Sequence, residues 1–242
     1  MRNAKRAHDM EKTESPQTQR PVRQDPLDAL GLSLRHGAAE LCLVRHGDAI
    51  PDAQAAYDEY DGHALSARGR VQADATAAYF ADLTVAAVYT SPTDRARETA
   101  QAVATRANLP LHIDEGLREV AIGSVEGAGN LATHLASLAT IAVRDGSWSS
   151  IPGTESSASI RGRIIPALDA IAARHPGERV VVVSHAGTIN AALATIAKSE
   201  RDFIFPLANT SISVVRINSG QRVILVANDT AHLRAIPSRG RA

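Results

Sequence analysis

The segment Arg179-Val-Val-Val-Val-Ser184 constrains the fold of this 242-residue chain more than any other part of the sequence. Four consecutive β-branched residues form a strand that is apolar on both of its faces. Such a strand is stable in water only when other elements cover both faces of its sheet. The run Glu40-Leu-Cys-Leu-Val44 has the same character and predicts a second buried strand. The sequence therefore predicts a sheet between two layers of helices.

Helical patterns alternate with strand patterns along the rest of the chain. Helices are expected after Ser66, after Ser91, over 131–143, after Thr154 and from about Gly187. Further strands are expected at 86–90, near 111–113, at 211–217 and at 222–228. This alternation is typical of parallel sheets joined by crossover helices. The predicted fold class is α/β, with a single three-layer α/β/α domain and a mostly parallel central sheet.

Three of these helices have start signals and an apolar face. The helix capped by Ser66 is expected to bury Val71, Ala75, Ala78 and Tyr79. The sequence Ser-Pro-Thr-Asp at 91–94 combines a capping residue, a proline and an acidic residue. The helix that it starts is expected to bury Ala96, Ala100, Val103 and Ala107. The helix capped by Thr154 is expected to bury Ile160, Ile164, Leu168 and Ile171.

Residues 1–38 lack this patterning. The segment is polar and mixed in charge, with no apolar period before Leu27, so it cannot bury enough apolar surface to offset the entropy of ordering it. We therefore expect a mostly disordered tail over 1–38, with a short turn at 26–32, and one domain over 39–235. An arm that binds a partner is the alternative for the tail.

Composition excludes several classes of protein. The 26 basic and 26 acidic residues balance, which argues against a broad basic surface for nucleic acid. The single cysteine, Cys42, excludes a disulfide framework and a multi-cysteine metal site. The chain has neither the apolar run of a membrane span nor that of a signal peptide. We expect a cytoplasmic protein; its oligomeric state is left open, with a dimer as one expectation.

Histidines and arginines follow the ends of three predicted strands. Arg45-His46-Gly47 follows the strand at 40–44, His185 follows the strand at 179–184, and Arg95 lies in the first turn of the helix after 86–90. The carboxyl ends of parallel strands meet at one edge of a sheet, where ligands bind. Guanidinium groups beside a helix N-terminus suit a phosphate group. The sequence therefore predicts an oxyanion site at this edge.

These residues stand in five segments that resemble, in the same order, the motifs of the histidine phosphatase superfamily, the phosphoglycerate mutase-like proteins. The segments are Leu43–Gly47, Leu65–Gln72, Ser91–Ala100, Leu117–Glu119 with Gly123 and Glu126-Gly127, and Val183–His185. The resemblance covers about residues 40–228. Ala49 and Ala186 depart from it, because the family commonly has a hydroxyl residue and a glycine there.

The resemblance implies an enzyme that works through a phosphohistidine. His46 would attack phosphorus, and Glu119 would protonate the leaving oxygen. The phosphoryl group would be held by Arg45, Arg95, His185, Gly47 and Ala186. Imidazole is substantially neutral and nucleophilic at pH 7, and fixed cations can stabilise the phosphoryl charge without a metal or another cofactor. The implied activity is a metal-independent phosphomonoesterase acting on a small phosphorylated substrate.

Three functions fit this set of residues. A phosphatase passes the phosphoryl group to water, a mutase returns it to another hydroxyl, and a catalytically dead module only binds a phosphorylated ligand. The complete set of charges disfavours the third. Mutases of the family typically carry a longer insertion before the second histidine than the interval between Glu119 and His185 here, which favours hydrolysis. Glu115 and Glu126 are the alternatives to Glu119 as the acid.

A second Arg-His-Gly triplet precedes the first predicted strand. Arg35-His36-Gly37 follows a poorer strand pattern than Arg45-His46-Gly47, so we assign it to the tail and not to the site. The substrate walls are expected from residues 50–64 and 123–154, which carry no readable code for a particular substrate. The acidic residues of the first stretch disfavour polyanionic substrates.

Overall fold

The structure is a computed structural model that describes residues 26–49, 64–122, 140–141 and 144–236. Within these residues, six strands form one sheet in the order β3-β2-β4-β1-β5-β6. The strands are β1 (Ala39–Arg45), β2 (Ala87–Thr90), β3 (Leu111–Ile113), β4 (Arg179–Ser184), β5 (Ile212–Asn218) and β6 (Gln221–Asp229). The pairs β1–β4, β2–β4 and β2–β3 are parallel, whereas β5 is antiparallel to β1 and to β6. The predicted α/β class with a mostly parallel sheet is confirmed.

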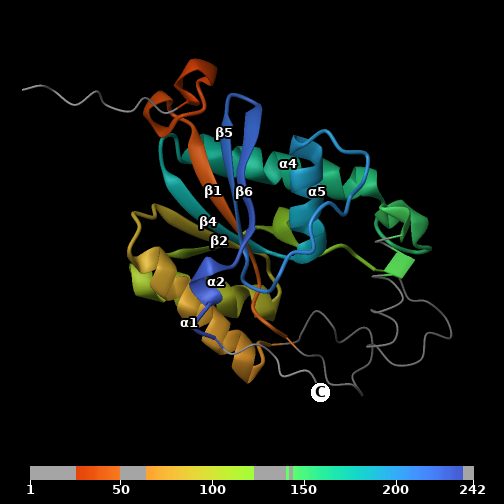
Figure 1. The fold of residues 1–242 in the computed structure, drawn as a ribbon, viewed down its shortest axis with the longest axis horizontal. Helices are drawn as coiled ribbons and strands as arrows, with labels where there is room; N and C mark the ends of the chain where they lie inside the picture. Colours follow the sequence, from red (N-terminus) through yellow and green to blue (C-terminus); the bar gives the residue numbers. More distant parts are fainter. Residues whose placement is uncertain (1–25, 50–63, 123–139, 142–143, 237–242) are drawn as a thin grey trace, which may run out of the picture.

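In the described part of the chain, four α-helices cover the two faces of the sheet (Figure 1). They are α1 (Ala67–Ala81), α2 (Asp94–Ala107), α4 (Ser157–Arg174) and α5 (Ala186–Ile196). Leu41 and Leu43 of β1 pack with α4 and α5, while Cys42 and Val44, which alternate with them, pack with α1 and α2. Because successive side chains of a strand point to opposite faces, each face has its own core. The predicted three layers are confirmed.

The valine run behaves as its composition predicts. Val180 and Val182 lie in the core on the α4 and α5 side, and Val181 and Val183 lie in the core on the other side. All four are fully buried. Burying one such side chain stabilises a fold by roughly 1.5–3 kcal/mol, so β4 anchors both cores at once.

Helix α1 starts as predicted but buries a different face. The Ser66 hydroxyl accepts a hydrogen bond from the Gly69 N–H, as a capping residue should. Val71 and Tyr79 are exposed, however, and the buried residues are Gly69, Gln72, Ala73, Thr76, Ala77 and Phe80. The aromatic ring of Phe80 fixes this face, and the buried polar groups have partners. The Thr76 hydroxyl donates to the Gln72 carbonyl oxygen at 2.9 Å.

Two other predicted helix starts are each two residues early, whereas the helix predicted from about Gly187 begins at Ala186. Helix α2 is capped at Thr93 and not at Ser91, and α4 is capped by Ser156 and not by Thr154. The predicted apolar face of α4 is buried in full, and that of α2 is buried except at Ala107, which is partly exposed. The helix predicted over 131–143 falls almost entirely outside the described residues.

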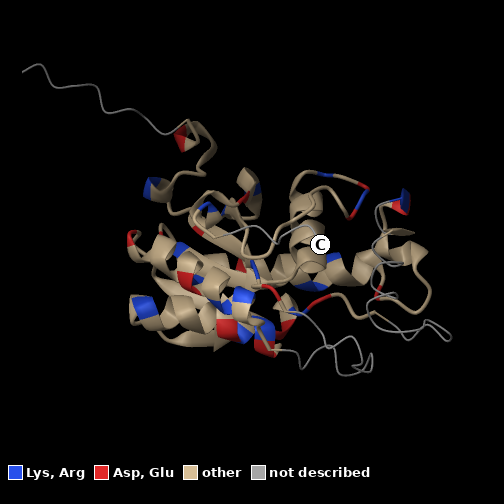
Figure 2. Cartoon of the chain, turned by 60° about the horizontal axis from the view of Figure 1, so that its bottom comes forward, with Lys and Arg blue, Asp and Glu red and all other residues tan. Residues whose placement is uncertain are grey.

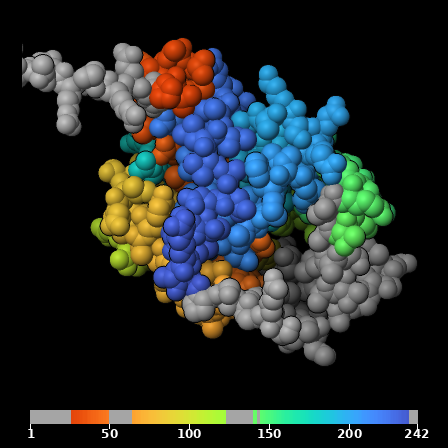
Figure 3. Space-filling view, viewed as in Figure 1, coloured from red at the N-terminus to blue at the C-terminus, as the bar shows by residue number. Residues whose placement is uncertain are grey.

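Residues 27–38, which belong to the predicted tail, pack against the domain. The segment forms two 3₁₀ helices, Asp28–Leu30 and Leu34–His36, the first of which lies within the predicted turn. Leu32 and Ala38 are buried, and the Asn218 side-chain amide donates to the Gly31 and His36 carbonyl oxygens at 2.8 and 3.2 Å. Figure 3 shows this segment seated on the β5–β6 hairpin. Residues 1–25 lie outside the described part.

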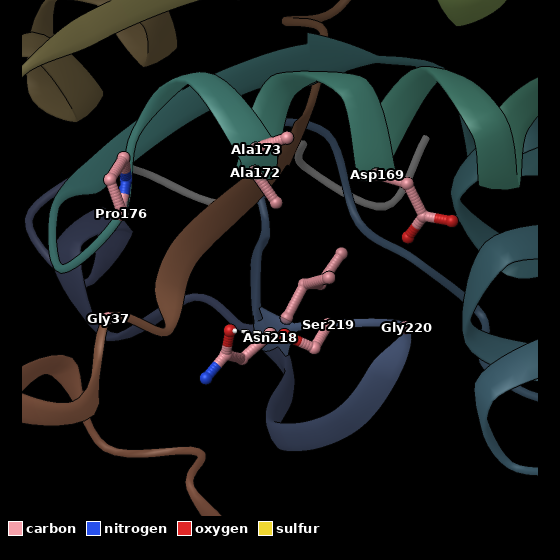
Figure 4. A pocket seen from close by; sticks show the side chains of 9 residues that line it. Gly37, Asp169, Ala172, Ala173, Pro176, Asn218, Ser219 and Gly220 are labelled. Atoms are coloured by element: carbon pink, nitrogen blue, oxygen red, sulfur yellow. Dashed lines mark hydrogen bonds between the residues drawn. The ribbon is translucent and has the colours of Figure 1, made fainter.

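A groove of about 410 Å³ lies beside this segment, between the end of α4 and the β5–β6 turn (Figure 4). Its lining includes Gly37, Asp169, Pro176 and Asn218. Gly37 and Pro176 precede β1 and β4, so the groove lies at the amino ends of the parallel strands. The predicted oxyanion site is at the opposite edge.

Basic and acidic residues occur along the same helices and loops of the described chain (Figure 2), and the formal net charge is zero. In the part of the chain that the structure describes, none of the helices is long and apolar enough to cross a membrane.

Candidate active site

The two predicted catalytic histidines meet because β1 and β4 end in register. Arg45 pairs with Ser184 as the last residues of the two parallel strands, and the His46 N–H donates to the Ser184 carbonyl oxygen at 2.9 Å. The rings of His46 and His185 are 5.0 Å apart between centroids. Both side chains are buried. The sheet therefore brings together two residues that are far apart in the sequence.

Arg95 lies between the two histidines. Its Nε–H donates to His46 Nε2 at 3.3 Å, and its Nη2 group contacts His185 Nδ1 at 3.4 Å. The side chain is only 1% exposed, although it carries a permanent charge. Burial of a cation is costly unless an anion or strong hydrogen bonds compensate for it. A guanidinium group held here is well placed to bind an anionic group next to His46.

Hydrogen bonds fix the tautomer of His46. Its Nδ1 atom is 2.7 Å from the Gly47 carbonyl oxygen, which can only accept, so Nδ1 carries the proton. The lone pair is then on Nε2, which receives the hydrogen bond from Arg95. The loop is held in turn by the Gly47 N–H, which donates to the Thr99 hydroxyl at 3.0 Å. The arrangement presents a neutral, oriented imidazole nitrogen.

Burial and nearby cations keep both histidines neutral. Desolvation and then the charges of Arg95 and Arg45 lower the pKa of His46 well below its usual value of 6.5. Desolvation likewise lowers the pKa of His185, with contributions from His46 and Arg95. A neutral imidazole is the form that can act as a nucleophile.

Arg45 is the last residue of β1, one residue beyond the predicted end of the strand, and Gly47 has a steric reason to be glycine. The Arg45 Nη1 group donates to the Leu207 carbonyl oxygen at 2.6 Å. A Cβ on Gly47 would be 2.7 Å from the Gly69 carbonyl oxygen, closer than real Cβ contacts. The first turn of α1 therefore packs directly on the backbone of the His46 loop.

Glu119 reaches the same edge of the sheet from the segment after β3. Its Oε1 atom accepts hydrogen bonds from the Val120 N–H at 2.9 Å and the Thr188 N–H at 3.2 Å. The latter belongs to the first turn of α5, which begins at Ala186 directly after His185. A carboxylate is favoured at a helix N-terminus. Glu115, by contrast, is exposed and pairs with Arg118, and Glu126 lies outside the described residues.

Ala186 is partly exposed, and the position that requires glycine is the next one. A Cβ on Gly187 would be 2.8 Å from Glu119 Oε1 and 2.7 Å from the Trp148 ring. The departure from the family pattern at Ala186 is therefore harmless to packing, whereas Gly187 allows the Glu119 carboxylate to approach α5.

Several polar side chains that contact the two histidines were not predicted from the sequence. His185 Nε2 is 2.8 Å from the Ser91 hydroxyl, which had been assigned to helix capping. The Asn209 side-chain amide donates to the His46 carbonyl oxygen at 3.1 Å. Ser91 is part of a recognised segment, so its location before α2 could have suggested this role. Asn209 lies in a loop without any motif.

In the described ranges, no group of three His, Cys, Asp or Glu residues is arranged to hold a metal ion.

Comparisons with known proteins agree with this geometry. Residues 41–230 match the profile of the histidine phosphatase superfamily (branch 1). The chain is 32% identical over 201 residues to phosphoglycerate mutase-like protein 4 of Arabidopsis thaliana, covering 81% of this chain and 87% of that protein. It is 30% identical over 204 residues to a metal-independent phosphoserine phosphatase of the same plant, covering 81% and 84%. The native structure of a mycobacterial glucosyl-3-phosphoglycerate phosphatase superposes with a TM-score of 0.67 at 25% identity, covering 80% of this chain and 100% of that one.

Proposed function

Because the chain belongs to branch 1 of the histidine phosphatase superfamily, we propose that it hydrolyses a small phosphomonoester through a phosphohistidine on His46. The observation that carries this proposal is the state of His46. Its Nδ1–H is anchored on the Gly47 carbonyl oxygen, so the lone pair is on Nε2, which accepts a hydrogen bond from the Arg95 Nε–H at 3.3 Å. Transfer of that Arg95 donor to a bound phosphoryl oxygen frees the lone pair for attack. A nucleophile and a phosphate-binding cation are therefore adjacent before substrate arrives.

In the first step, His46 Nε2 attacks phosphorus and the bond to the leaving oxygen breaks. Glu119 donates its proton to that oxygen, so that an alcohol leaves instead of an alkoxide. Arg45, Arg95 and His185, with the backbone at Gly47 and Ala186, bind the phosphoryl oxygens. A bound dianion favours the protonated form of His185, because its negative charge opposes the burial and the nearby positive charges that lower the pKa of this ring.

In the second step, water attacks phosphorus and the N–P bond breaks. The Glu119 carboxylate takes a proton from the water, and inorganic phosphate leaves with His46 neutral again. The protein supplies positioning and positive charge at each stage, which is the main requirement of phosphoryl transfer. We therefore propose that the reaction is independent of metal ions, as the name of one plant relative indicates for that protein.

The test is a rapid-quench experiment with substrates labelled at the phosphoryl group. Small phosphomonoesters that carry a carboxylate, including phosphoserine and phosphoglycerate derivatives, are the first panel, because relatives are named for such substrates. We expect release of inorganic phosphate in excess EDTA and an acid-labile, base-stable label on His46. His46→Ala should give neither. Label on a serine or aspartate would reject the mechanism, and transfer to a second hydroxyl without release of phosphate would identify a mutase.

A further inference from the structure

Arg163 on α4 holds the chain segment that carries Glu119. Its Nη1 group donates to the Gly116 and Arg118 carbonyl oxygens at 3.0 and 2.8 Å, and its Nη2 group donates to the Glu119 carbonyl oxygen at 3.0 Å. Three backbone carbonyls within four residues thus share one guanidinium. After the short 3₁₀ helix Glu115–Leu117, this segment has no regular structure, so its carbonyls need partners from elsewhere.

Glu155 completes the arrangement from the other side. Its Oε1 and Oε2 atoms accept hydrogen bonds from Arg163 Nε and Nη2, each at 2.9 Å. With these two bonds, all five N–H donors of the guanidinium are used. Glu155 also forms two hydrogen bonds with the backbone of Ala121. The Ala121 N–H donates to Glu155 Oε2 at 3.3 Å, and the Glu155 N–H donates to the Ala121 carbonyl oxygen at 2.7 Å.

The pair is well shielded and ionic. Both side chains are 15% exposed. Burial opposes ionisation of Glu155, yet the hydrogen bonds and charge of Arg163 hold the pKa of this carboxyl below its usual value. A bidentate pair of this kind is geometrically specific as well as strong. It therefore fixes the backbone on both sides of Glu119 to the rigid start of α4.

We propose that Arg163 and Glu155 are positioning residues for the general acid, setting where the Glu119 carboxyl stands relative to the leaving oxygen. This inference rests on the role assigned to Glu119 in the proposed function. Misplacement of a catalytic group by about 1 Å can cost roughly 10²-fold in rate. A loss of positioning should therefore slow substrates whose leaving group needs a proton and spare those whose leaving group does not.

The experiment compares kcat/KM for an alkyl phosphate and for p-nitrophenyl phosphate. Glu119→Gln should lose roughly 10²–10⁴-fold on the alkyl phosphate and far less on the aryl ester, which leaves as a stable anion. Arg163→Met should lose roughly 10–100-fold on the alkyl phosphate and less than about threefold on the aryl ester. Glu155→Gln should show the same selectivity at a smaller size. In the Glu119→Gln background, adding Arg163→Met should change the alkyl rate less than about threefold.

Arg161 provides a matched control two residues away. It is also on α4 and also pairs with a carboxylate: its Nε and Nη2 groups both donate to Asp202 Oδ1, at 3.2 and 2.8 Å. Its other hydrogen bonds are to the carbonyl oxygens of residues 199–201. Arg161→Met should lower stability without leaving-group selectivity. If Arg163→Met does not fold, Arg163→Lys keeps the charge with fewer donors, and it should show a smaller loss with the same selectivity.

The outcomes separate the two proposals. Equal losses on both substrates for the Arg163 and Glu155 variants, or additive losses in the double variant, would overturn the positioning role. If Glu119→Gln itself shows no selectivity, or if His46 takes no label, the fault lies with the proposed function instead.

Discussion

The chain carries the triplet Arg-His-Gly twice, ten residues apart, and the fold places the two copies at opposite ends of the strands of the sheet. Arg35-His36-Gly37 comes before β1, whereas Arg45-His46-Gly47 straddles its end. The seven residues of β1 separate them by roughly 20 Å. The His36 side chain is 53% exposed and contacts Ser33 and Asp28, while His46 is buried against Arg95.

The difference shows what a motif needs beyond its letters. Each histidine has a backbone carbonyl held by an asparagine amide, Asn218 for His36 and Asn209 for His46. Each triplet ends in a glycine, but only Gly47 lies directly against another part of the backbone, at the Gly69 carbonyl. Only the second copy lies at the carboxyl ends of parallel strands, where Arg95 and His185 also arrive. The topology of the sheet therefore determines which copy is able to do chemistry.

The largest contrast is expected from the histidines themselves. His46→Ala removes the proposed nucleophile and should lower kcat/KM by at least about 10³-fold. His36→Ala should leave it within about twofold, because its ring contacts only the segment before β1. Steady-state assays on the same phosphomonoester measure both. A large loss in His36→Ala would contradict the separation of the two copies.

The two glycines should differ in what they affect. Gly47→Ala places a Cβ 2.7 Å from the Gly69 carbonyl oxygen and should displace the His46 loop, lowering kcat/KM roughly 10²-fold. Gly37 has a φ of +82° and no atom nearer than 4.0 Å to an added Cβ. Gly37→Ala should thus cost about 1–2 kcal/mol of unfolding free energy through backbone strain, with kcat/KM unchanged. Urea titration measures the stability of each variant, and steady-state assays measure its kcat/KM. Similar losses of kcat/KM in the two variants would contradict the prediction that only Gly47 supports the site.

The depressed histidine pKa values predict how stability responds to acid. In the unfolded chain His46 and His185 take up protons near pH 6.5, whereas in the folded protein their pKa values are lower. The unfolded state then binds more protons below about pH 6.5. The free energy of unfolding should therefore decrease as the pH is lowered through this range, by at most about 1.4 kcal/mol per pH unit for each histidine. His36→Ala should retain this dependence and His46→Ala should weaken it. Identical slopes for wild type and His46→Ala, from urea titrations between pH 5 and 7, would refute the assignment.

The asparagines give the smallest and most closely matched comparison. Asn218→Ala and Asn209→Ala each remove an amide that donates to the carbonyl of one of the two histidines. Each should lower the free energy of unfolding by about 0.5–1.5 kcal/mol. Only Asn209→Ala should also lower kcat/KM, by several-fold. If Asn218→Ala leaves stability unchanged, residues 27–38 do not contribute to the fold as the structure indicates.

Strands and the charged residues that follow them were readable from the sequence because their signals are local. The valine run identified β4, and the ends of β1 and β4 located His46 and His185. The face of α1 was not readable. Thr76 and Gln72 are buried because tertiary contacts satisfy them, with Gln72 Oε1 accepting from the Asp48 N–H at 2.8 Å, and periodicity cannot detect such contacts.

The supporting residues were missed for a similar reason. Asn209 bonds to a residue 163 positions away, and Arg163 bonds to Glu119 over 44 positions. No local pattern marks a side chain whose role is fixed by a partner so distant. Leu32 and Ala38 are isolated apolar residues in a polar segment, so no local pattern in the sequence shows that both are buried.

The position of β1 between β4 and β5 also affects how the chain folds as the ribosome makes it. Glu40 aligns with Arg179 on one side and Arg216 on the other, so the first strand to be synthesised is among the last to find its neighbours. Until most of the domain has been translated, this apolar strand has no edge to join. Contacts of such long sequence separation slow folding and leave nascent chains open to aggregation. His46, directly after β1, is therefore translated 139 residues before His185, and the two rings can come together only once β4 has been made.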